Sequence, residues 1–324
     1  MHYRKLGTTG LVVSEIGFGA WGIGGRSIGE TSYGDTDDMV SLAALARALD
    51  CGITFIDTSP AYGAGHSEEL IGRALSGRRG EVVIATKAGY EDWARPADFS
   101  PAAIRRSVEA SLRRLRTGYI DLLQLHNPPS EVLARPETGQ ALADLVTEGK
   151  VRNWGVSAKS PQMALEALRV AGAPLIQANF NMMDVRALTS GLLDEVAARE
   201  AGFIARTPLC FGFLSGTIGR TAVFPPGDHR LGWSRAQLDN WIDGAADLMQ
   251  AVGAAPGEEG ALAALRFCLS FPAIATTIPG ILRPGEAEAN ARAGALGPLP
   301  APSVEAVLEI NRRREFFVAP ARAS

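Results

Sequence analysis

Short apolar segments rich in Val, Ile and Phe recur along the chain, and this repetition is the feature that most constrains its fold. The segments are continuously apolar rather than alternating with polar residues, which is typical of parallel strands buried on both faces. The intervals between them leave room for one helix each. Eight strands are predicted in this way: Glu15–Gly19, Ile53–Asp57, Val82–Thr86, Tyr119–Leu125, Asn153–Ser157, Leu175–Ala178, Phe203–Arg206 and Ile274–Ile278.

Helical patterns lie between most of these strands. Asp37–Cys51 places its apolar residues on one face. Ser100 is a good N-cap for the helix that follows it, and Gly118 is the expected stop. Leu188–Ala201 predicts one helix that ends at Gly202. Eight alternating strands and helices fit a closed (β/α)₈ barrel, the TIM-barrel member of the α/β class.

Two further segments complete the predicted architecture. Tyr3–Leu6 and Leu11–Val13 flank a glycine-containing turn, and we expect a hairpin that plugs the barrel floor. Phe211–Trp241 is rich in Gly, Pro and aromatic residues, so we expect a long loop after strand 7. No linker-like composition divides the chain, and a single domain is therefore expected across residues 1–324.

Composition excludes several classes of protein. The net charge is −3, whereas a nucleic-acid binder needs a basic excess or a basic face. No apolar run approaches the ~18 residues of a membrane span, and the N-terminus lacks the apolar core of a signal peptide. The 3 cysteines and 4 histidines suggest neither a disulfide framework nor a metal site. We expect a cytoplasmic protein without nucleic-acid or membrane partners.

The segment Gly17–Gly22 matches the dinucleotide-binding pattern G-x-G-x-x-G after a predicted strand. That pattern requires a helix to follow, but more glycines follow here and disfavour one. We therefore favour a glycine-rich turn where the backbone passes close to another group. Trp21 would form a wall of the pocket mouth.

Four polar residues occupy places where a barrel builds its active site. Asp57, Lys87 and His126 end predicted strands 2, 3 and 4, and Tyr62 follows five residues after Asp57. A Lys at the end of a buried strand needs a partner, and Asp57 on the adjacent strand is available. Taken singly, each residue has an ordinary structural explanation, as a cap, a rim aromatic, a surface residue or a turn residue.

Together the four residues predict a device for proton transfer. Tyr has a pKa near 10, which a neighbouring ammonium lowers. Asp57 would hold the ammonium of Lys87, and a neutral His126 would orient a substrate carbonyl. Tyr62 would then protonate a carbonyl oxygen as its carbon gains a hydride, or run the reverse reaction.

Several segments, in this order along the chain, resemble the motifs of the aldo-keto reductase family: residues 55–68, 83–87, 119–126, 149–157, 176–181, 207–209 and 278–280. The resemblance implies a (β/α)₈ barrel with an NAD(P) cofactor across its top and reversible reduction of aldehydes or ketones. It also implies that Tyr62 is the general acid, that Lys87 and Asp57 tune it, and that His126 orients the carbonyl. Trp21, Tyr62 and His126 would contact the substrate.

The resemblance also implies a cofactor site. Ser157 and Gln177 match the pair that holds the nicotinamide carboxamide, and Ala158 replaces an Asn that is usual in the family. Arg206 stands where an aromatic residue often stacks on the ring; it would stack through its guanidinium or pair with an acid. The full expected set is Gly19, Ala20, Trp21, Asp57, Ser157, Gln177, Arg206, Thr207, Pro208, Leu209, Phe211, Gly280, Arg283, Glu286 and Asn290.

The adenosine end and the substrate are less defined. Arg283 suits a 2′-phosphate, whereas Glu286 would repel one. What is frequent in the family then implies NADP(H), with NAD(H) as the alternative. The substrate is expected to be a small carbonyl, alcohol or sugar, selected by residues 88–99 and 211–241. Two other functions stay open. One is a regulatory subunit that binds the cofactor without catalysis, and the other is a lyase that forms a Schiff base on Lys87.

Overall fold

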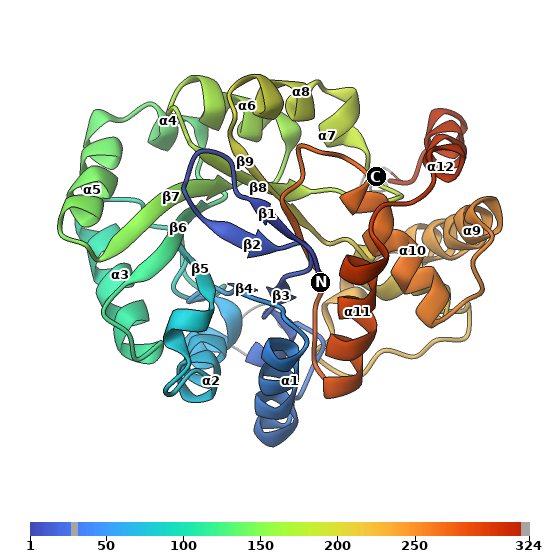
Figure 1. Cartoon of the computed structure of the whole chain (residues 1–324), viewed down its shortest axis with the longest axis horizontal. Helices are drawn as coiled ribbons and strands as arrows, with labels where there is room; N and C mark the ends of the chain where they lie inside the picture. Colours follow the sequence, from blue (N-terminus) through green and yellow to red (C-terminus); the bar gives the residue numbers. More distant parts are fainter. Residues whose placement is uncertain (27–31, 319–324) are drawn as a thin grey trace, which may run out of the picture.

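A computed structural model describes residues 1–26 and 32–318 of the chain. Its parallel strands surround a common axis with the helices outside them (Figure 1). Neighbouring strands are bonded in chain order, and bridges from Ile16 to Thr277 and from Gly19 to Gly280 join the last strand to the first. The predicted (β/α)₈ barrel is therefore confirmed. Its strands are β3 (Phe18–Gly19), β4 (Phe55–Asp57), β5 (Val83–Ala88), β6 (Ile120–His126), β7 (Val151–Ser157), β8 (Leu175–Asn179), β9 (Gly202–Arg206) and β10 (Thr276–Ile278).

The helices start where local chemistry favours a start. Asp37 accepts hydrogen bonds from two backbone amides of α1, and Ser100 accepts one from Ala103 in α3. No helix in the described part of the chain is long and apolar enough to cross a membrane. The helices are α1 (Asp38–Asp50), α2 (His66–Ala74), α3 (Pro101–Arg114), α4 (Ser130–Leu133), α5 (Pro136–Thr147), α6 (Pro161–Arg169), α7 (Arg186–Thr189), α8 (Leu192–Ala198), α9 (Arg235–Val252), α10 (Glu258–Leu269), α11 (Pro284–Leu296) and α12 (Ala301–Arg313).

Two predicted helix ends were wrong. Helix α3 is followed by Arg116 in the left-handed conformation (φ 52°), so Gly118 is not its stop. The expected helix over 188–201 is two helices, because Gly191 takes φ 75° between α7 and α8. Gly202 does not end a helix; it begins β9, where an added Cβ would lie 3.0 Å from the side chain of Leu175.

The long loop after β9 is shorter than expected. It contains the short 3₁₀ helices η4 (Cys210–Ser215) and η5 (His229–Gly232). It ends at Ser234, which caps α9. Trp241 belongs to the buried face of α9 rather than to the loop. The aromatic content of the segment therefore reflects packing of α9 as well as the loop.

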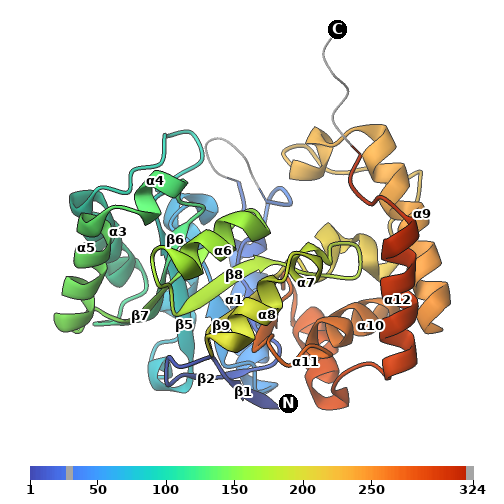
Figure 2. The same cartoon turned by 90° about the horizontal axis from the view of Figure 1, so that it is seen from above.

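The N-terminal hairpin closes one end of the barrel, as predicted (Figure 2). Its strands β1 (Tyr3–Lys5) and β2 (Val12–Ser14) are antiparallel. Leu6 and Val13 are fully buried in a core cluster with side chains from inside the barrel, including Phe55, Leu122 and Ile204. This apolar floor leaves the opposite end of the barrel for a binding site.

The G-x-G-x-x-G match does not open a long helix. Gly22–Gly24 forms only the short 3₁₀ helix η1. A Cβ added to Gly19 would lie 2.8 Å from the carbonyl oxygen of Pro279, so glycine is needed there for close approach of the backbone after β10. The expectation of a glycine-rich turn is confirmed for the residues up to 26; the rest of the run, 27–31, lies outside the described residues.

Candidate active site

Lys87 is the centre of a buried polar cluster at the end of the barrel opposite the hairpin. Its Nζ lies 2.5 Å and 2.8 Å from the two carboxylate oxygens of Asp57. It also donates to the carbonyl oxygen of Thr58 at 2.8 Å and lies 3.1 Å from Oη of Tyr62. The ammonium is therefore fully satisfied, and its cost of burial is offset by a carboxylate and two further oxygens.

Two amide side chains fix Asp57 from the other side. Gln177 on β8 donates to Oδ2 of Asp57 at 3.0 Å, and Gln124 on β6 donates to the same atom at 3.3 Å. Gln124 pairs in register with Lys87 between β5 and β6. Sequence reasoning missed Gln124, although a Gln within the apolar strand 122–125 was a usable signal. The carboxylate accepts hydrogen bonds from three side chains and cannot swing away from Lys87.

Tyr62 reaches Lys87 because of the sharp turn that follows it. Tyr62 begins the 3₁₀ helix η2 (Tyr62–Gly65), which leads directly into α2. Gly63 has φ 64°, and an added Cβ would collide with the backbone of Gly24. Glycine at positions 24 and 63 lets η2 pack against η1. This packing turns the phenol of Tyr62 toward β5.

His126 completes the cluster at the end of β6. Its ring meets that of Tyr62 edge to face, with centroids 6.4 Å apart, and Nδ1 lies 3.5 Å from Oγ of Ser59. Tyr90 and Trp93 pack against the same imidazole. The structure thus brings together the side chains of Asp57, Tyr62, Lys87 and His126.

The environment sets the protonation state of each group. Burial, together with the positive charges of Lys87 and Arg206, holds the pKa of His126 well below its usual value, so the ring is neutral. Burial opposes the charge of Lys87, but Asp57 and Tyr62 together outweigh that effect, so the pKa of Lys87 is raised. Burial also raises the pKa of Tyr62, and Lys87 offsets only part of that increase. The expected lowering of the Tyr62 pKa is therefore a partial effect, and the phenol stays protonated at neutral pH.

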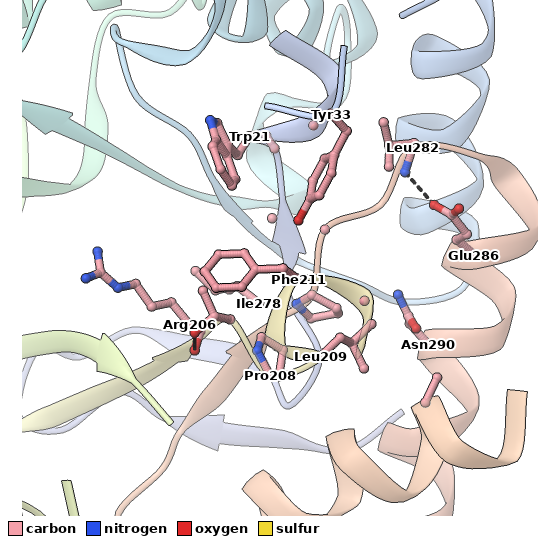
Figure 3. A pocket seen from close by; sticks show the side chains of 18 of the residues that line it. Trp21, Tyr33, Arg206, Pro208, Leu209, Phe211, Ile278, Leu282, Glu286 and Asn290 are labelled. Atoms are coloured by element: carbon pink, nitrogen blue, oxygen red, sulfur yellow. Dashed lines mark hydrogen bonds between the residues drawn. The ribbon is translucent and has the colours of Figure 1, made fainter. Parts of the chain in front are cut away.

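A cavity of ≈ 730 Å³ opens above this cluster (Figure 3). Its size and mixed apolar and polar lining are typical of small-molecule and cofactor sites. Thirteen of the residues expected from sequence to bind a cofactor line it: Gly19, Ala20, Trp21, Asp57, Gln177, Arg206, Thr207, Pro208, Leu209, Phe211, Gly280, Glu286 and Asn290. Tyr62 and His126, which are also expected to contact the substrate, line it as well.

Other lining residues were not anticipated. Tyr33 and Arg230 come from two loops that meet through a bridge between Tyr33 and Asp228. Asn179 follows Gln177 on the same face of β8, since alternate residues of a strand share a face. That alternation was a usable signal for Asn179, whereas the meeting of two distant loops left no trace in the sequence.

Arg206 covers Ser157 at the end of the cavity near Tyr62. Its guanidinium donates to Oγ of Ser157 at 3.2 Å, to Oδ1 of Asn179 at 2.7 Å and to the carbonyl oxygen of Ala158 at 3.0 Å. Ser157 is fully buried and does not line the cavity. In the described part of the chain, no carboxylate forms an ion pair with Arg206, so the alternative of pairing with an acid does not hold.

The other end of the cavity is acidic. Oε2 of Glu286 accepts hydrogen bonds from the backbone amides of Leu282 and Arg283 at 2.7 Å and 3.3 Å, which caps α11. Glu258, in the first turn of α10, also lines this end and is paired with Arg292. The side chain of Arg283 is exposed and does not line the cavity.

This arrangement fits a dinucleotide. Figure 3 shows Arg206 on one side of the cavity and Glu286 and Asn290 on the other, with the apolar side chains of Leu209 and Phe211 between them. The polar groups at the two ends of the cavity suit the two polar rings at the ends of such a molecule. The residues that would hold a nicotinamide cofactor are therefore present.

Comparison with known proteins agrees with this geometry. A family model described as "Aldo/keto reductase family" matches residues 15–312. The chain is 33% identical over 297 residues to the aldo-keto reductase YhdN of Bacillus subtilis (strain 168), which covers 89% of this chain and 87% of that protein. It is 34% identical over 255 residues to the NADH-specific methylglyoxal reductase of Escherichia coli (strain K12), which covers 73% and 76% of the two chains.

A solved structure gives the same result. The glycerol dehydrogenase AKR11B4 from Gluconobacter oxydans matches with a TM-score of 0.79 at 28% identity, over 99% of this chain and 98% of that one. The family match covers nearly the whole barrel, and the first relative exceeds 30% identity over most of both chains. The chain therefore belongs to the aldo-keto reductase family of oxidoreductases.

Proposed function

We propose that this protein reduces aldehydes or ketones, and oxidises the corresponding alcohols, with Tyr62 as the general acid and base. The observation that carries the proposal is the contact of the Lys87 ammonium with both Asp57 and the Tyr62 hydroxyl beneath the cavity. The dihydronicotinamide of the cofactor, when bound, supplies a hydride to the carbonyl carbon. Relatives that act on methylglyoxal and glycerol support this class of substrate.

Tyr62 supplies the proton in the reducing direction. Its protonated phenol donates a hydrogen bond to the carbonyl oxygen and transfers the proton as negative charge develops there. The Lys87 ammonium, 3.1 Å from Oη, stabilises the phenolate that remains. Asp57 keeps the ammonium in place without contacting the substrate. In the oxidising direction the phenolate takes the proton of the alcohol.

His126 orients the carbonyl rather than transferring a proton. Its pKa lies well below the usual value, so the ring is neutral across the physiological range. A neutral imidazole has one N–H donor, which suits a carbonyl oxygen, and the ring lines the cavity beside Tyr62. Trp21, which also lines the cavity, limits the space for the rest of the substrate.

The cofactor is proposed to lie along the cavity. Gln177 and Arg206 would contact its nicotinamide end, and residues 207–211 would contact its central phosphates. Asn290 would contact the adenine. Glu286 would contact the neighbouring ribose, because a carboxylate accepts hydrogen bonds from a 2′-hydroxyl.

We favour NAD(H) over the NADP(H) that the sequence favoured. A 2′-phosphate would lie close to the carboxylate of Glu286, and like charges in a partly enclosed cavity repel; the other carboxylate at this end, Glu258, is paired with Arg292. Glu286 also accepts hydrogen bonds from the backbone amides of Leu282 and Arg283, which directly precede α11, so these two amides are not free to bind a phosphate. Arg283 is exposed and does not line the cavity, so it offers no compensation.

The test is turnover of a panel of small aldehydes and ketones with NADH and NADPH by the purified protein. We expect turnover with a higher kcat/KM for NADH, and a loss of at least 100-fold in kcat in Tyr62→Phe. Tyr3→Phe is the matched control, because Tyr3 is exposed on the hairpin and its hydroxyl donates to the Gly52 carbonyl, far from the cavity.

Three results would overturn the proposal. Turnover that is unchanged in Tyr62→Phe would remove the assigned acid. Borohydride trapping of a carbonyl substrate on Lys87 would instead favour the lyase. Tight cofactor binding without any turnover, in the wild-type protein, would favour the regulatory subunit.

A further inference from the structure

Arg206 is an unusual cation for a partly buried place. Its three hydrogen bonds all go to neutral oxygens, on Ser157, Asn179 and Ala158. Most buried arginines are paired with a carboxylate because an unpaired charge is costly to remove from water. Within residues 1–26 and 32–318, Arg206 has no such pair. A net positive charge therefore remains beside the cavity.

The neighbouring charged side chains do not cancel the positive charge of Arg206. Lys87 is neutralised by Asp57, with which it forms a buried ion pair. Arg230, which also lines the cavity, is paired with Asp228. Asp184, a carboxylate that also acts on Arg206, is paired with Arg186. Among the described residues at the end of the cavity near Tyr62, Arg206 is thus the positive charge without a carboxylate partner of its own.

A short chain of hydrogen bonds places Arg206 close to the reacting groups. Arg206 donates to Oγ of Ser157, which donates to Oε1 of Gln177 at 3.0 Å. Gln177 in turn donates to Asp57, the partner of Lys87. Hydride transfer requires the redox ring to lie against a carbonyl held by Tyr62. The ring must therefore occupy the same end of the cavity as Arg206.

We propose that Arg206 makes the site discriminate by charge between the two redox states of the nicotinamide, holding the reduced cofactor and expelling the oxidised one. This inference rests on the proposed function. The oxidised ring carries a positive charge that the guanidinium repels, whereas the dihydronicotinamide ring is neutral. Tight binding of NADH and weak binding of NAD⁺ load the free enzyme for reduction and hasten product release.

The test is a comparison of binding rather than of turnover. Trp21 lines the cavity, so quenching of tryptophan fluorescence gives Kd for NADH and for NAD⁺ without any substrate. We expect NADH to bind at least about tenfold more tightly than NAD⁺, and Arg206→Gln to reduce that ratio about tenfold. Arg206→Lys keeps the charge and is expected to retain most of the ratio.

Further variants separate charge from shape. Arg206→Met is a second neutral variant, in case Arg206→Gln does not fold. Arg169→Gln is the matched control, because Arg169 is an exposed arginine on α6 that pairs with Glu195. It removes one positive charge far from the cavity and is expected to leave the ratio unchanged.

The outcomes distinguish the two proposals. If both dinucleotides bind and the ratio is the same in wild type and Arg206→Gln, the inference is overturned while the proposed function stands. The inference is also overturned if Arg206→Gln leaves the ratio of the two Kd values unchanged and lowers kcat/KM only for carbonyl substrates that carry a carboxylate. Arg206 would then bind the substrate rather than sense the charge of the cofactor. If neither dinucleotide binds, both the proposed function and the inference fail.

Discussion

Lys87 and Asp57 form an ion pair that is buried inside the barrel, with Nζ 2.5 Å from Oδ1. The pair links β4 to β5, which are adjacent strands of the sheet. A buried pair of this kind contributes little net stability, but removal of one partner leaves a charge without compensation. The pair therefore couples folding to the proposed chemistry.

We predict that Asp57→Asn and Lys87→Met each lower the free energy of unfolding by about 3–5 kcal/mol. In the double variant the loss should be smaller than the sum of the two, since neither charge remains unpaired. Urea unfolding followed by circular dichroism measures this. Tyr62→Phe keeps the ion pair and should lose less than about 1 kcal/mol. Strictly additive losses would show that the two side chains do not act as a pair.

The raised pKa of Tyr62 predicts different pH profiles for the two directions. Reduction needs the protonated phenol, so its kcat/KM should stay level through neutral pH and fall only near the pKa of Tyr62. Oxidation needs the phenolate, so its kcat/KM should rise about tenfold per pH unit over the same range. Initial rates in both directions between pH 6 and pH 9.5 test this. An oxidation rate that is independent of pH would contradict the role given to Tyr62.

The neutral state of His126 has a consequence for stability. Its pKa in the folded protein lies well below the usual value of 6.5. Below pH 6.5 the unfolded chain binds a proton that the folded chain does not, so stability falls as the pH decreases toward the folded pKa. His126→Asn should reduce this pH dependence by up to about 1.4 kcal/mol per pH unit. Urea unfolding at pH 7.5, 6.5 and 5.5 measures it, with His2→Asn, an exposed site, as the control. An equal slope in all three proteins would refute the assignment.

The contacts of Arg4 indicate how much the N-terminal hairpin contributes to the stability of the barrel. Its guanidinium donates to the carbonyl oxygens of Leu269 and Ile274 at 2.9 Å each and pairs with Glu15. These bonds join β1 to the end of α10 and to the residues just before β10. Arg4→Ala should lower the free energy of unfolding by about 2–4 kcal/mol, while the exposed Lys5→Ala should change it by less than about 0.5 kcal/mol. Similar losses in the two variants would mean that the contacts of Arg4 carry no stability.

The sequence was sufficient for the barrel and for the four polar residues because both depend on local patterns. Strand ends converge in any (β/α)₈ barrel, so Asp57, Lys87 and His126 had to face one site. Helix ends were less predictable, because Arg116 takes a left-handed conformation that glycine normally provides. The pKa of Tyr62 was misjudged because the depth of its burial is a property of the whole fold. For the same reason the sequence did not show that Arg206 would cover Ser157.

The carboxylate of Glu286 at one end of the cavity leads us to predict that this residue sets the preference for NADH over NADPH. Glu286→Gln keeps an oxygen that caps α11 but removes the negative charge from the cavity. The ratio of kcat/KM for NADPH to that for NADH should therefore rise about three- to tenfold, because less repulsion opposes a 2′-phosphate. Glu259→Gln is a matched control, since Glu259 caps the neighbouring helix through the amide of Ala255 and does not line the cavity. Steady-state rates with both cofactors at one aldehyde concentration give the two values of kcat/KM and hence this ratio. An unchanged ratio in Glu286→Gln would place the 2′ position of the ribose elsewhere in the cavity.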